Sequence, residues 1–198
     1  MSIQDFNNYF GDMDLFLMDL ILKGHIKRDA EVLDIGCGEG RNGIYFIREA
    51  YTYHGWDTDA SKLKLLEYLA KSIAHAKATF ETHDIREAAE EKKFDLVICS
   101  RLLHFATTKD DFLLMWNKIA DRLDKDGILY ASMDSAVDTG IASRRNNGTV
   151  EFPDGRVSFA LTNDLYDEIR KGFEEVEPLR TLVHHNERAQ SFVCLRKL

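Results

Sequence analysis

The strongest constraint on the fold of this chain is one glycine-rich segment, EVLDIGCGEGRNG, at positions 31–43. In this segment an apolar run ends in an acid, three glycines alternate with other residues, and a helix-forming sequence follows. Glycine tolerates positive φ and lets a ligand approach the backbone with no Cβ in the way. A strand that turns this tightly into a helix leaves N–H groups free at the helix start, where they suit an anionic or polar ligand. The segment therefore predicts a strand, a ligand-binding loop and a helix in succession.

Strand and helix patterns alternate along the rest of the chain. Apolar residues at helical spacing predict a helix or a helix pair between Phe6 and Ile21, with Gly11 as a break. Further helices are expected at 43–49, 61–76, 108–123 and 163–172, the last of them capped by Asn163. Strands are expected at 32–35, 51–56, 78–82, 94–100, 128–133, 176–183 and 191–196. This alternation predicts an α/β fold with a mostly parallel sheet.

The final third of the chain differs in character. Residues 134–148 are polar and have no clear periodicity. Residues 149–152 and 156–159 flank the turn sequence Pro153-Asp154-Gly155 and predict a β-hairpin. Because no repeat or low-complexity segment divides the sequence, residues 1–198 are predicted to form one domain with an inserted hairpin.

Composition and charge argue against several classes of function. The 198 residues carry a formal net charge of -8, which is a poor match for polyphosphate, so nucleic acid is not an expected partner. The three cysteines are widely separated and form no C-x-x-C pair, so neither a metal site nor a disulfide framework is expected. The chain lacks a basic n-region and an apolar run of bilayer length, so a cytoplasmic protein without membrane contact is expected.

The glycine-rich loop fits two kinds of cofactor. Residues 38–43 read G-x-G-x-x-G, the dinucleotide fingerprint, which taken alone is weak evidence. A dinucleotide and an adenosine-type cofactor both require an acid about 20 residues further on, at the end of the second strand, to hold ribose hydroxyls. Asp57 supplies that acid, with a helix cap near Asp59 as its alternative role.

Further motifs resemble those of the class I S-adenosylmethionine-dependent methyltransferases. Asp34 opens an acid–x–Gly–x–Gly–x–Gly pattern, His83-Asp84-Ile85 follows the third strand, and residues 94–105 (FDLVICSRLLHF) resemble the fourth-strand motif of the family. The likeness covers nearly the whole chain in the expected order. It implies a Rossmann-like fold, a mostly parallel seven-stranded sheet with an antiparallel C-terminal strand and helices on both faces. It also implies transfer of a methyl group from S-adenosylmethionine to a small-molecule nucleophile, with S-adenosylhomocysteine as product.

The resemblance implies a set of cofactor-binding residues. In the family the glycine loop cradles the cofactor, the first acid organises the loop near the methionine end, and the acid after the second strand holds the ribose. The acid and apolar residue after the third strand contact the adenine. The positions implied here are Asp34, Gly36, Cys37, Gly38, Gly40, Asp57, Thr58, Asp84, Ile85 and Ser100. Asp84 has the alternative of an ordinary turn residue, and Cys37 is expected to be a small loop residue without a nucleophilic role.

His104 is the candidate general base. It stands four residues after Ser100, just beyond the predicted fourth strand, where ligands bind in open α/β sheets. An ordinary imidazole pKa of about 6.5 suits proton removal at neutral pH. The alternative is a histidine that only packs or forms a hydrogen bond.

Two flanking segments are expected to cover the site. The resemblance implies that residues 1–30 form an N-terminal helical cap, in which Tyr9 is a candidate lid residue. The alternative for Tyr9 is a core residue on an apolar stripe of the helix. Residues 134–160 are expected to overhang the substrate side, where Arg144 suits a carboxylate or a phosphate. A solvated loop is the alternative explanation for Arg144.

The methyl acceptor is left open by these motifs. Residues 37–42 and 55–57 resemble the tellurite-resistance and thiopurine branch, whereas the hairpins look more like bacterial small-molecule methyltransferases. Two other functions remain as alternatives: a non-catalytic S-adenosylmethionine-binding protein and a nicotinamide-dependent oxidoreductase. The protein is expected to be a monomer or a homodimer.

Overall fold

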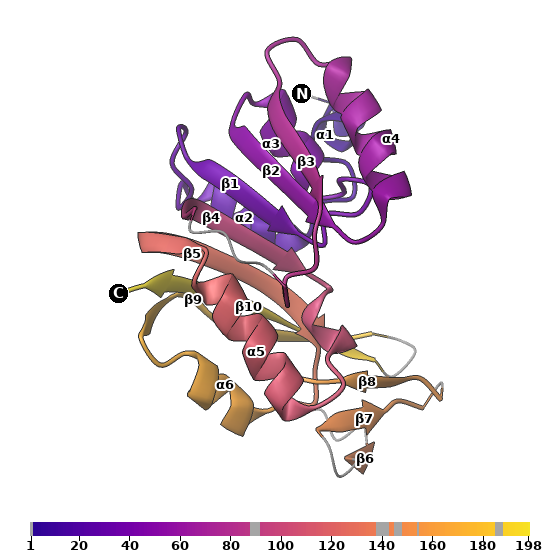
Figure 1. Ribbon diagram of the computed structural model, residues 1–198, viewed down its shortest axis with the longest axis vertical. Coiled ribbons are helices and arrows are strands. Elements are labelled where there is room, and N and C mark those ends of the chain that lie inside the picture. The colour runs from indigo at the N-terminus through magenta and orange to yellow at the C-terminus, as the bar shows by residue number, and fades with distance from the viewer. Residues whose placement is uncertain (1, 88–91, 138–142, 145–147, 154, 185–187) are drawn as a thin grey trace.

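One seven-stranded sheet forms the centre of the molecule (Figure 1). The computed structural model describes residues 2–87, 92–137, 143–144, 148–153, 155–184 and 188–198. The strands of the sheet are β1 (Glu31–Ile35), β2 (Thr52–Asp57), β3 (Lys77–Thr82), β4 (Phe94–Ser100), β5 (Leu123–Asp134), β9 (Phe173–Val183) and β10 (Ala189–Lys197). They lie in the order β3-β2-β1-β4-β5-β10-β9. Neighbours from β3 to β5 are parallel, and β10 is antiparallel to both β5 and β9. The predicted mostly parallel sheet with an antiparallel C-terminal strand is confirmed.

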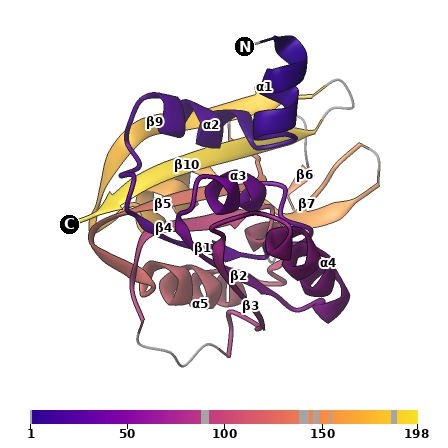
Figure 2. The ribbon, with the colours of Figure 1, turned by 90° about the horizontal axis from the view of Figure 1, so that it is seen from above.

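Helices cover both faces of this sheet. On one face lie α1 (Ile3–Phe10), α2 (Leu15–Leu22), α3 (Gly43–Arg48) and α4 (Ala60–Lys71). On the other lie α5 (Lys109–Ala120) and α6 (Asn163–Ile169). Figure 2 shows α2 and α3 on the side of the sheet opposite to α5. A short 3₁₀ helix, η1 (Leu103–Phe105), follows β4.

The strand sequences are apolar on both faces because each strand is covered twice. Successive side chains of a strand point to opposite faces of a sheet. Val32 accordingly packs with the α1–α4 layer, whereas Leu33 packs with the α5–α6 layer. In β4, Leu96 and Val97 divide in the same way. The continuous apolar runs at 32–35 and 94–100 are thus the signature of a parallel sheet between two helical layers.

Two helix boundaries depend on single residues. Gly11 has φ +61° and separates α1 from α2, as predicted. The N-terminal cap of α6 is Thr162 and not the predicted Asn163, because the Thr162 hydroxyl accepts the hydrogen bond of the Leu165 N–H at 3.3 Å. Both side chains suit an N-cap, so the sequence does not distinguish them.

A separate three-stranded sheet contains the predicted hairpin. Its strands are β6 (Ser143–Arg144), β7 (Thr149–Glu151) and β8 (Val157–Phe159), of which β7 and β8 form the hairpin and β6 was not predicted. Asp154 of the predicted turn lies outside the described residues. Phe159 stacks on Phe112 of α5 with ring centroids 5.0 Å apart, so β8 packs against the main domain. In the described part of the chain, no helix is long and apolar enough to cross a membrane.

Candidate functional site

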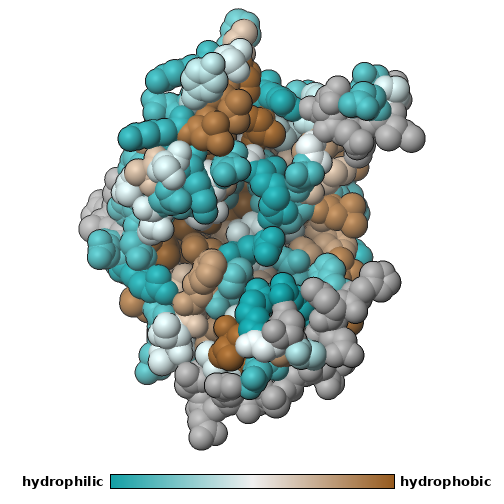
Figure 3. Space-filling view, turned by 90° about the vertical axis from the view of Figure 1, so that its right-hand side faces the viewer, coloured by the Kyte–Doolittle hydropathy of each residue, from teal (hydrophilic) through white to brown (hydrophobic). Residues whose placement is uncertain are grey.

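A cavity of about 930 Å³ lies at the carboxyl ends of the central strands. The sheet order reverses direction between β1 and β4, and ligands bind at such a switch point in open α/β sheets. Figure 3 looks onto the side to which these strand ends point in Figure 1, and hydrophilic residues dominate the visible face. The predicted site residues that line the cavity are Asp34, Gly36, Cys37, Gly38, Asp57, Thr58, Asp84, Ile85, Ser100 and His104. The chain therefore brings together residues that are up to 70 positions apart, from Asp34 to His104.

The glycine-rich loop is fixed at its start and open at its centre. The N–H groups of Gly36 and Cys37 donate to the Trp56 carbonyl oxygen at 2.7 and 3.0 Å, which ties the loop to β2. Gly38 has φ +55°, and a Cβ built on it would meet no atom within 4 Å. The backbone at Gly38 is thus open to a ligand, with no side chain in the way.

Gly40 has a different place in the loop from Gly36 and Gly38. It is absent from the residues that line the cavity. Its φ is +86°, and an added Cβ would lie 2.3 Å from a methyl carbon of Leu66 in α4. Gly40 therefore allows the loop to pack closely against α4, and its contact with the cofactor stays a prediction.

Asp57 links the loop to the end of β2. One carboxylate oxygen accepts the Gly38 N–H at 2.8 Å, and the other accepts the Asp59 N–H at 2.8 Å. The cap of α4 is Asp59, whose side chain accepts the Ser61 N–H at 2.9 Å. Asp57 is consequently not the α4 cap, and both of its oxygens retain lone pairs for a further donor.

Burial changes the acid–base chemistry beneath the loop. Asp34 is 2% exposed and accepts a hydrogen bond from the Tyr53 hydroxyl at 3.0 Å. Loss of hydration raises the pKa of the Asp34 carboxyl to about 7, against the opposing effect of that hydrogen bond. Burial also raises the pKa of the Cys37 thiol well above its ordinary value, so Cys37 is not an activated nucleophile.

The segment after β3 supplies the predicted adenine-binding residues. The Asp84 carboxylate accepts the Arg86 N–H at 2.9 Å, and its side chain lines the cavity. Ile85 is 3% exposed and belongs to the core on the α5 side. Thr58, at the end of β2, is exposed on the cavity wall.

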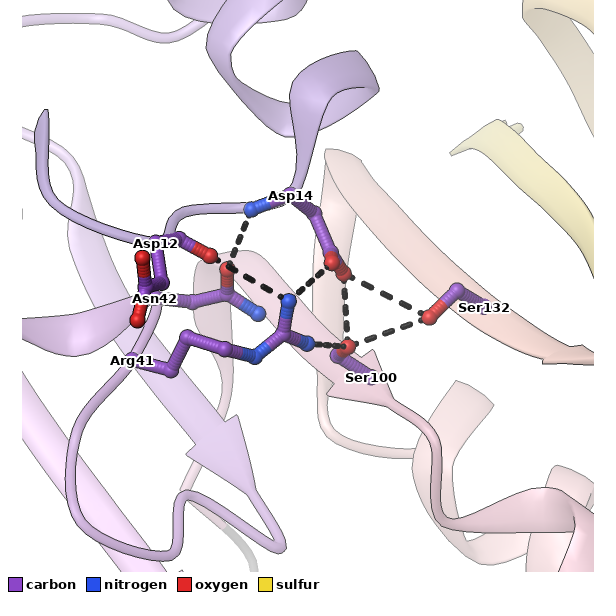
Figure 4. A network of polar contacts seen from close by, with 6 residues as sticks. All are labelled: Asp12, Asp14, Arg41, Asn42, Ser100 and Ser132. Atoms are coloured by element: carbon purple, nitrogen blue, oxygen red, sulfur yellow. Dashed lines mark hydrogen bonds and ion pairs between the residues drawn. The ribbon is translucent and has the colours of Figure 1, made fainter.

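A network around Arg41 joins the N-terminal segment to the glycine loop and to β4 (Figure 4). The guanidinium pairs with the Asp14 carboxylate and donates to the Ser100 hydroxyl at 2.7 Å. Ser100 in turn donates to Asp14 at 2.6 Å and lies 3.0 Å from the hydroxyl oxygen of Ser132. Asp14 is 8% exposed, and its N–H donates to the Asn42 side chain at 2.9 Å. Ser100 therefore anchors Arg41 at the cavity wall.

Asp14 is the site-organising residue that sequence reasoning missed. Its position before α2 suggests a helix cap, but its side chain forms no cap hydrogen bond. No local pattern identifies Arg41 as its partner, because the two residues are separated by 27 positions.

His104 lies on η1 at the cavity and is 9% exposed. Its Nδ1 atom is buried and has no hydrogen-bond partner among the described residues. Burial lowers the pKa of the imidazole; the carboxylate of Asp134 opposes this shift, and the charges of Arg156 and Arg101 add to it. The imidazole is consequently neutral at pH 7.

Of the two candidate covering residues, the structure describes the side chain of Tyr9. The Tyr9 hydroxyl donates to the Glu49 carboxylate, and the Tyr9 ring packs edge-on against Tyr45 of α3. Tyr9 thus belongs to the packing of α1 on α3, and it does not line the cavity. Arg144 lies in β6, and its side chain falls outside the described part of the chain.

Comparison with known proteins gives sequence matches over part of the chain. Residues 32–127, from β1 into β5, match the model of a methyltransferase domain. A probable S-adenosyl-L-methionine-dependent methyltransferase, TehB from Haemophilus influenzae, is 25% identical over 87 residues. That alignment covers 44% of this chain and 30% of TehB, so the chain matches less than a third of this curated relative.

Solved structures share the fold over most of this chain. The crystal structure of Haemophilus influenzae TehB has a TM-score of 0.71 at 17% identity, over 91% of this chain and 62% of that one. The 1,6-didemethyltoxoflavin-N1-methyltransferase of Burkholderia thailandensis, solved with its substrate and S-adenosylhomocysteine, has a TM-score of 0.70 at 21% identity. That match covers 98% of this chain and 86% of the other. Residues 32–127 thus match a methyltransferase domain, and the chain shares the fold of methyltransferases of known structure.

Proposed function

We propose that this chain is a class I methyltransferase domain and that it transfers the methyl group of S-adenosylmethionine to a small-molecule nucleophile. One observation carries the proposal: a single cavity gathers the open glycine loop, Asp57 at the end of β2, and Asp84 with Ile85 after β3. These residues come from three separate loops, and each matches a cofactor-binding position that the family resemblance implies.

The residues present fit the cofactor in volume and chemistry. Small-molecule sites in proteins usually measure about 300–1,000 Å³, and the cavity lies within that range. Asp57 offers charge-assisted acceptors for ribose hydroxyls, and Asp84 offers an acceptor for the adenine amino group. Gly38 gives an open backbone between them. These residues would hold the cofactor along the ends of β1, β2 and β3.

The protein's contribution to methyl transfer is orientation and exclusion of water. S-adenosylmethionine supplies an electrophilic methyl group on its sulfonium when bound. The cavity walls then need only align a nucleophile with that carbon, and proximity and orientation can account for about 7–11 kcal/mol of the barrier. No covalent intermediate with the protein is required.

His104 is our proposed general base for acceptors that arrive protonated. Because its lowered pKa keeps the imidazole neutral at pH 7, it can accept a proton from the nucleophile at the cavity wall. An acceptor that is already ionised, such as a thiolate, needs no such base.

Calorimetric titration tests the cofactor assignment. S-adenosylhomocysteine should bind saturably with a stoichiometry of one per chain, and NADH should give no heat of binding. Saturable binding of NADH without binding of S-adenosylhomocysteine would instead identify a nicotinamide-dependent protein. Formation of S-adenosylhomocysteine with a metabolite pool then distinguishes an enzyme from a non-catalytic binding protein.

A further inference from the structure

Basic side chains on the cavity wall differ in how their charge is neutralised. Among the described residues that line the cavity, the arginines and lysines are Arg41, Lys62, Arg86 and Arg101. Arg86 donates two hydrogen bonds, at 2.8 and 3.1 Å, to the two carboxylate oxygens of Asp111. Arg41 pairs with Asp14, and the charge of Lys62 acts on the Asp59 carboxyl. Three of these four cations therefore have an acidic neighbour within the protein.

Arg101 is the exception. No described carboxylate forms an ion pair with it, and its side chain is exposed on the cavity wall. Its backbone adopts φ +59°, a left-handed conformation that is sterically unfavourable for a residue with a Cβ. The Arg101 N–H donates to the Ser132 carbonyl oxygen at 2.8 Å, which fixes this conformation between β4 and β5. The fold thus holds the Arg101 guanidinium at the end of β4 with no counter-ion in the described part of the chain.

Arg101 lines the cavity together with the proposed general base. His104 and Phe105 of η1 line the same wall, and the charge of Arg101 acts on the His104 imidazole. Phe105 is 64% exposed, although it is a large apolar residue at a cavity. The wall therefore combines a cation, an apolar ring and a neutral imidazole, which together suit a small molecule with an anionic group and an apolar body.

We propose that Arg101 binds a carboxylate group of the methyl acceptor, so that the substrate of this domain is a small carboxylate-bearing molecule. This inference rests on the proposed methyltransferase function. A guanidinium matches a carboxylate through two parallel hydrogen bonds, which fix the orientation of the bound molecule as well as its position. The apolar body of the acceptor then packs against Phe105, and its nucleophilic atom lies toward His104.

The cofactor also contains a carboxylate, and Arg41 is the cation that lies in the glycine loop proposed to hold that cofactor. Arg41 belongs to the glycine loop, and Asp14 and Ser100 hold its guanidinium at that end of the cavity. Arg101 lies on a different element, after β4, beside His104. An experiment on the protein already saturated with S-adenosylhomocysteine separates the two carboxylates.

The test compares three aromatic molecules of similar size and different charge: benzoate, benzamide and benzylamine. Each is titrated by calorimetry into the protein saturated with S-adenosylhomocysteine. Benzoate should bind saturably and more tightly than benzamide by about tenfold or more, and benzylamine should bind least. Arg101→Gln should abolish the preference for benzoate and leave the affinity for S-adenosylhomocysteine unchanged. Arg101→Gly should do the same, and because glycine accepts the positive φ, this variant guards against misfolding.

Arg28→Gln is the matched control, since it removes the same charge from a side chain that is 79% exposed and lies off the cavity. It should keep the preference for benzoate. The proposal is wrong if benzoate shows no saturable binding, if benzamide or benzylamine binds as tightly, or if Arg28→Gln removes the preference equally. A loss of S-adenosylhomocysteine affinity in both Arg101 variants would also contradict it, because Arg101 would then serve the cofactor. Failure of the unchanged protein to bind S-adenosylhomocysteine would refute the proposed function itself.

Discussion

The Asp57 carboxylate accepts a hydrogen bond from the backbone N–H of Gly38, with 2.8 Å between the two heavy atoms. The end of β2 thereby sets the shape of the loop that follows β1. Asp57 also lines the cavity, so one side chain both organises the glycine loop and faces the space proposed for the cofactor. This carboxylate would consequently couple the geometry of the loop to the ribose binding that we propose for Asp57.

Asp57→Ala should therefore weaken binding of S-adenosylhomocysteine by roughly 1.5–3 kcal/mol, because it removes a charge-assisted acceptor. Thr162→Ala, which removes the cap of α6 away from the cavity, is the control for a general loss of stability. It should lower the free energy of unfolding by about 1 kcal/mol and leave the affinity unchanged. Normal affinity in Asp57→Ala, combined with a much lower melting temperature, would show that Asp57 is only structural.

Asp14→Ala should destabilise the protein and weaken cofactor binding together. The substitution leaves the Ser100 and Ser132 hydroxyls and the Arg41 guanidinium without their shared acceptor. A loss of about 1–3 kcal/mol in the free energy of unfolding is expected from these unsatisfied groups. Urea unfolding with and without S-adenosylhomocysteine measures both effects. Equal stabilisation by the ligand in the variant and the unchanged protein would show that Asp14 plays no part in the site.

Gly40→Ala should lower stability through a clash with Leu66, since the added Cβ would lie 2.3 Å from a Leu66 methyl carbon. Overpacking of this kind costs about 1–3 kcal/mol. In the double variant with Leu66→Ala, the cost of Gly40→Ala should be smaller, because the clashing atoms are gone. Strictly additive unfolding free energies would show that the positive φ of Gly40, and not Leu66, sets the cost.

The stability of the protein should depend on pH through Asp34. Burial raises the pKa of its carboxyl to about 7 in the folded protein. In the unfolded chain the pKa of this carboxyl is about 3.9. Between about pH 4 and 7 the folded protein therefore keeps the Asp34 proton, whereas the unfolded chain has lost it. The stability that this proton contributes to the folded protein is lost as the pH rises through 7. Asp34→Asn should remove this contribution to the slope between about pH 4 and 7. An identical slope in Asp34→Asn would contradict the raised pKa.

The pH dependence of methyl transfer should reveal the role of His104. Burial lowers the pKa of its imidazole below the ordinary value of about 6.5. As a base it loses activity when protonated, so kcat/KM should fall as the pH drops through this lowered pKa. His104→Gln should abolish that limb and reduce turnover by about 10²-fold or more. A flat profile in the unchanged enzyme would exclude the base and favour an ionised nucleophile such as a thiolate.

Local patterns in the sequence were sufficient to predict the sheet and the residues along one wall of the cavity. The run at 31–43 encodes a strand, a loop and a helix through neighbouring residues, and the apolar runs of β4 and β5 mark buried strands. Asp57 could be placed opposite the loop because the carboxyl ends of adjacent parallel strands meet at one edge.

Contacts between distant segments could not be predicted in this way. The pairing of Asp14 with Arg41 depends on how α2 docks on the sheet, and the need for glycine at position 40 depends on Leu66 in α4. Tyr9 has the spacing of an amphipathic helix, but its spacing does not say whether it covers the cavity or packs on α3. Tertiary packing determines these contacts, and the local sequence pattern does not record them.

Transfer of a labelled methyl group tests the central claim most directly. The protein is incubated with S-adenosylmethionine carrying an isotopic label in its methyl group and with a pool of small metabolites from which macromolecules have been removed. We predict that label enters a low-mass product and that an equal amount of S-adenosylhomocysteine forms, at a rate that Asp57→Ala reduces sharply. If the protein binds S-adenosylhomocysteine but forms neither the labelled product nor S-adenosylhomocysteine above the level of a protein-free sample, the proposed methyltransferase function is contradicted.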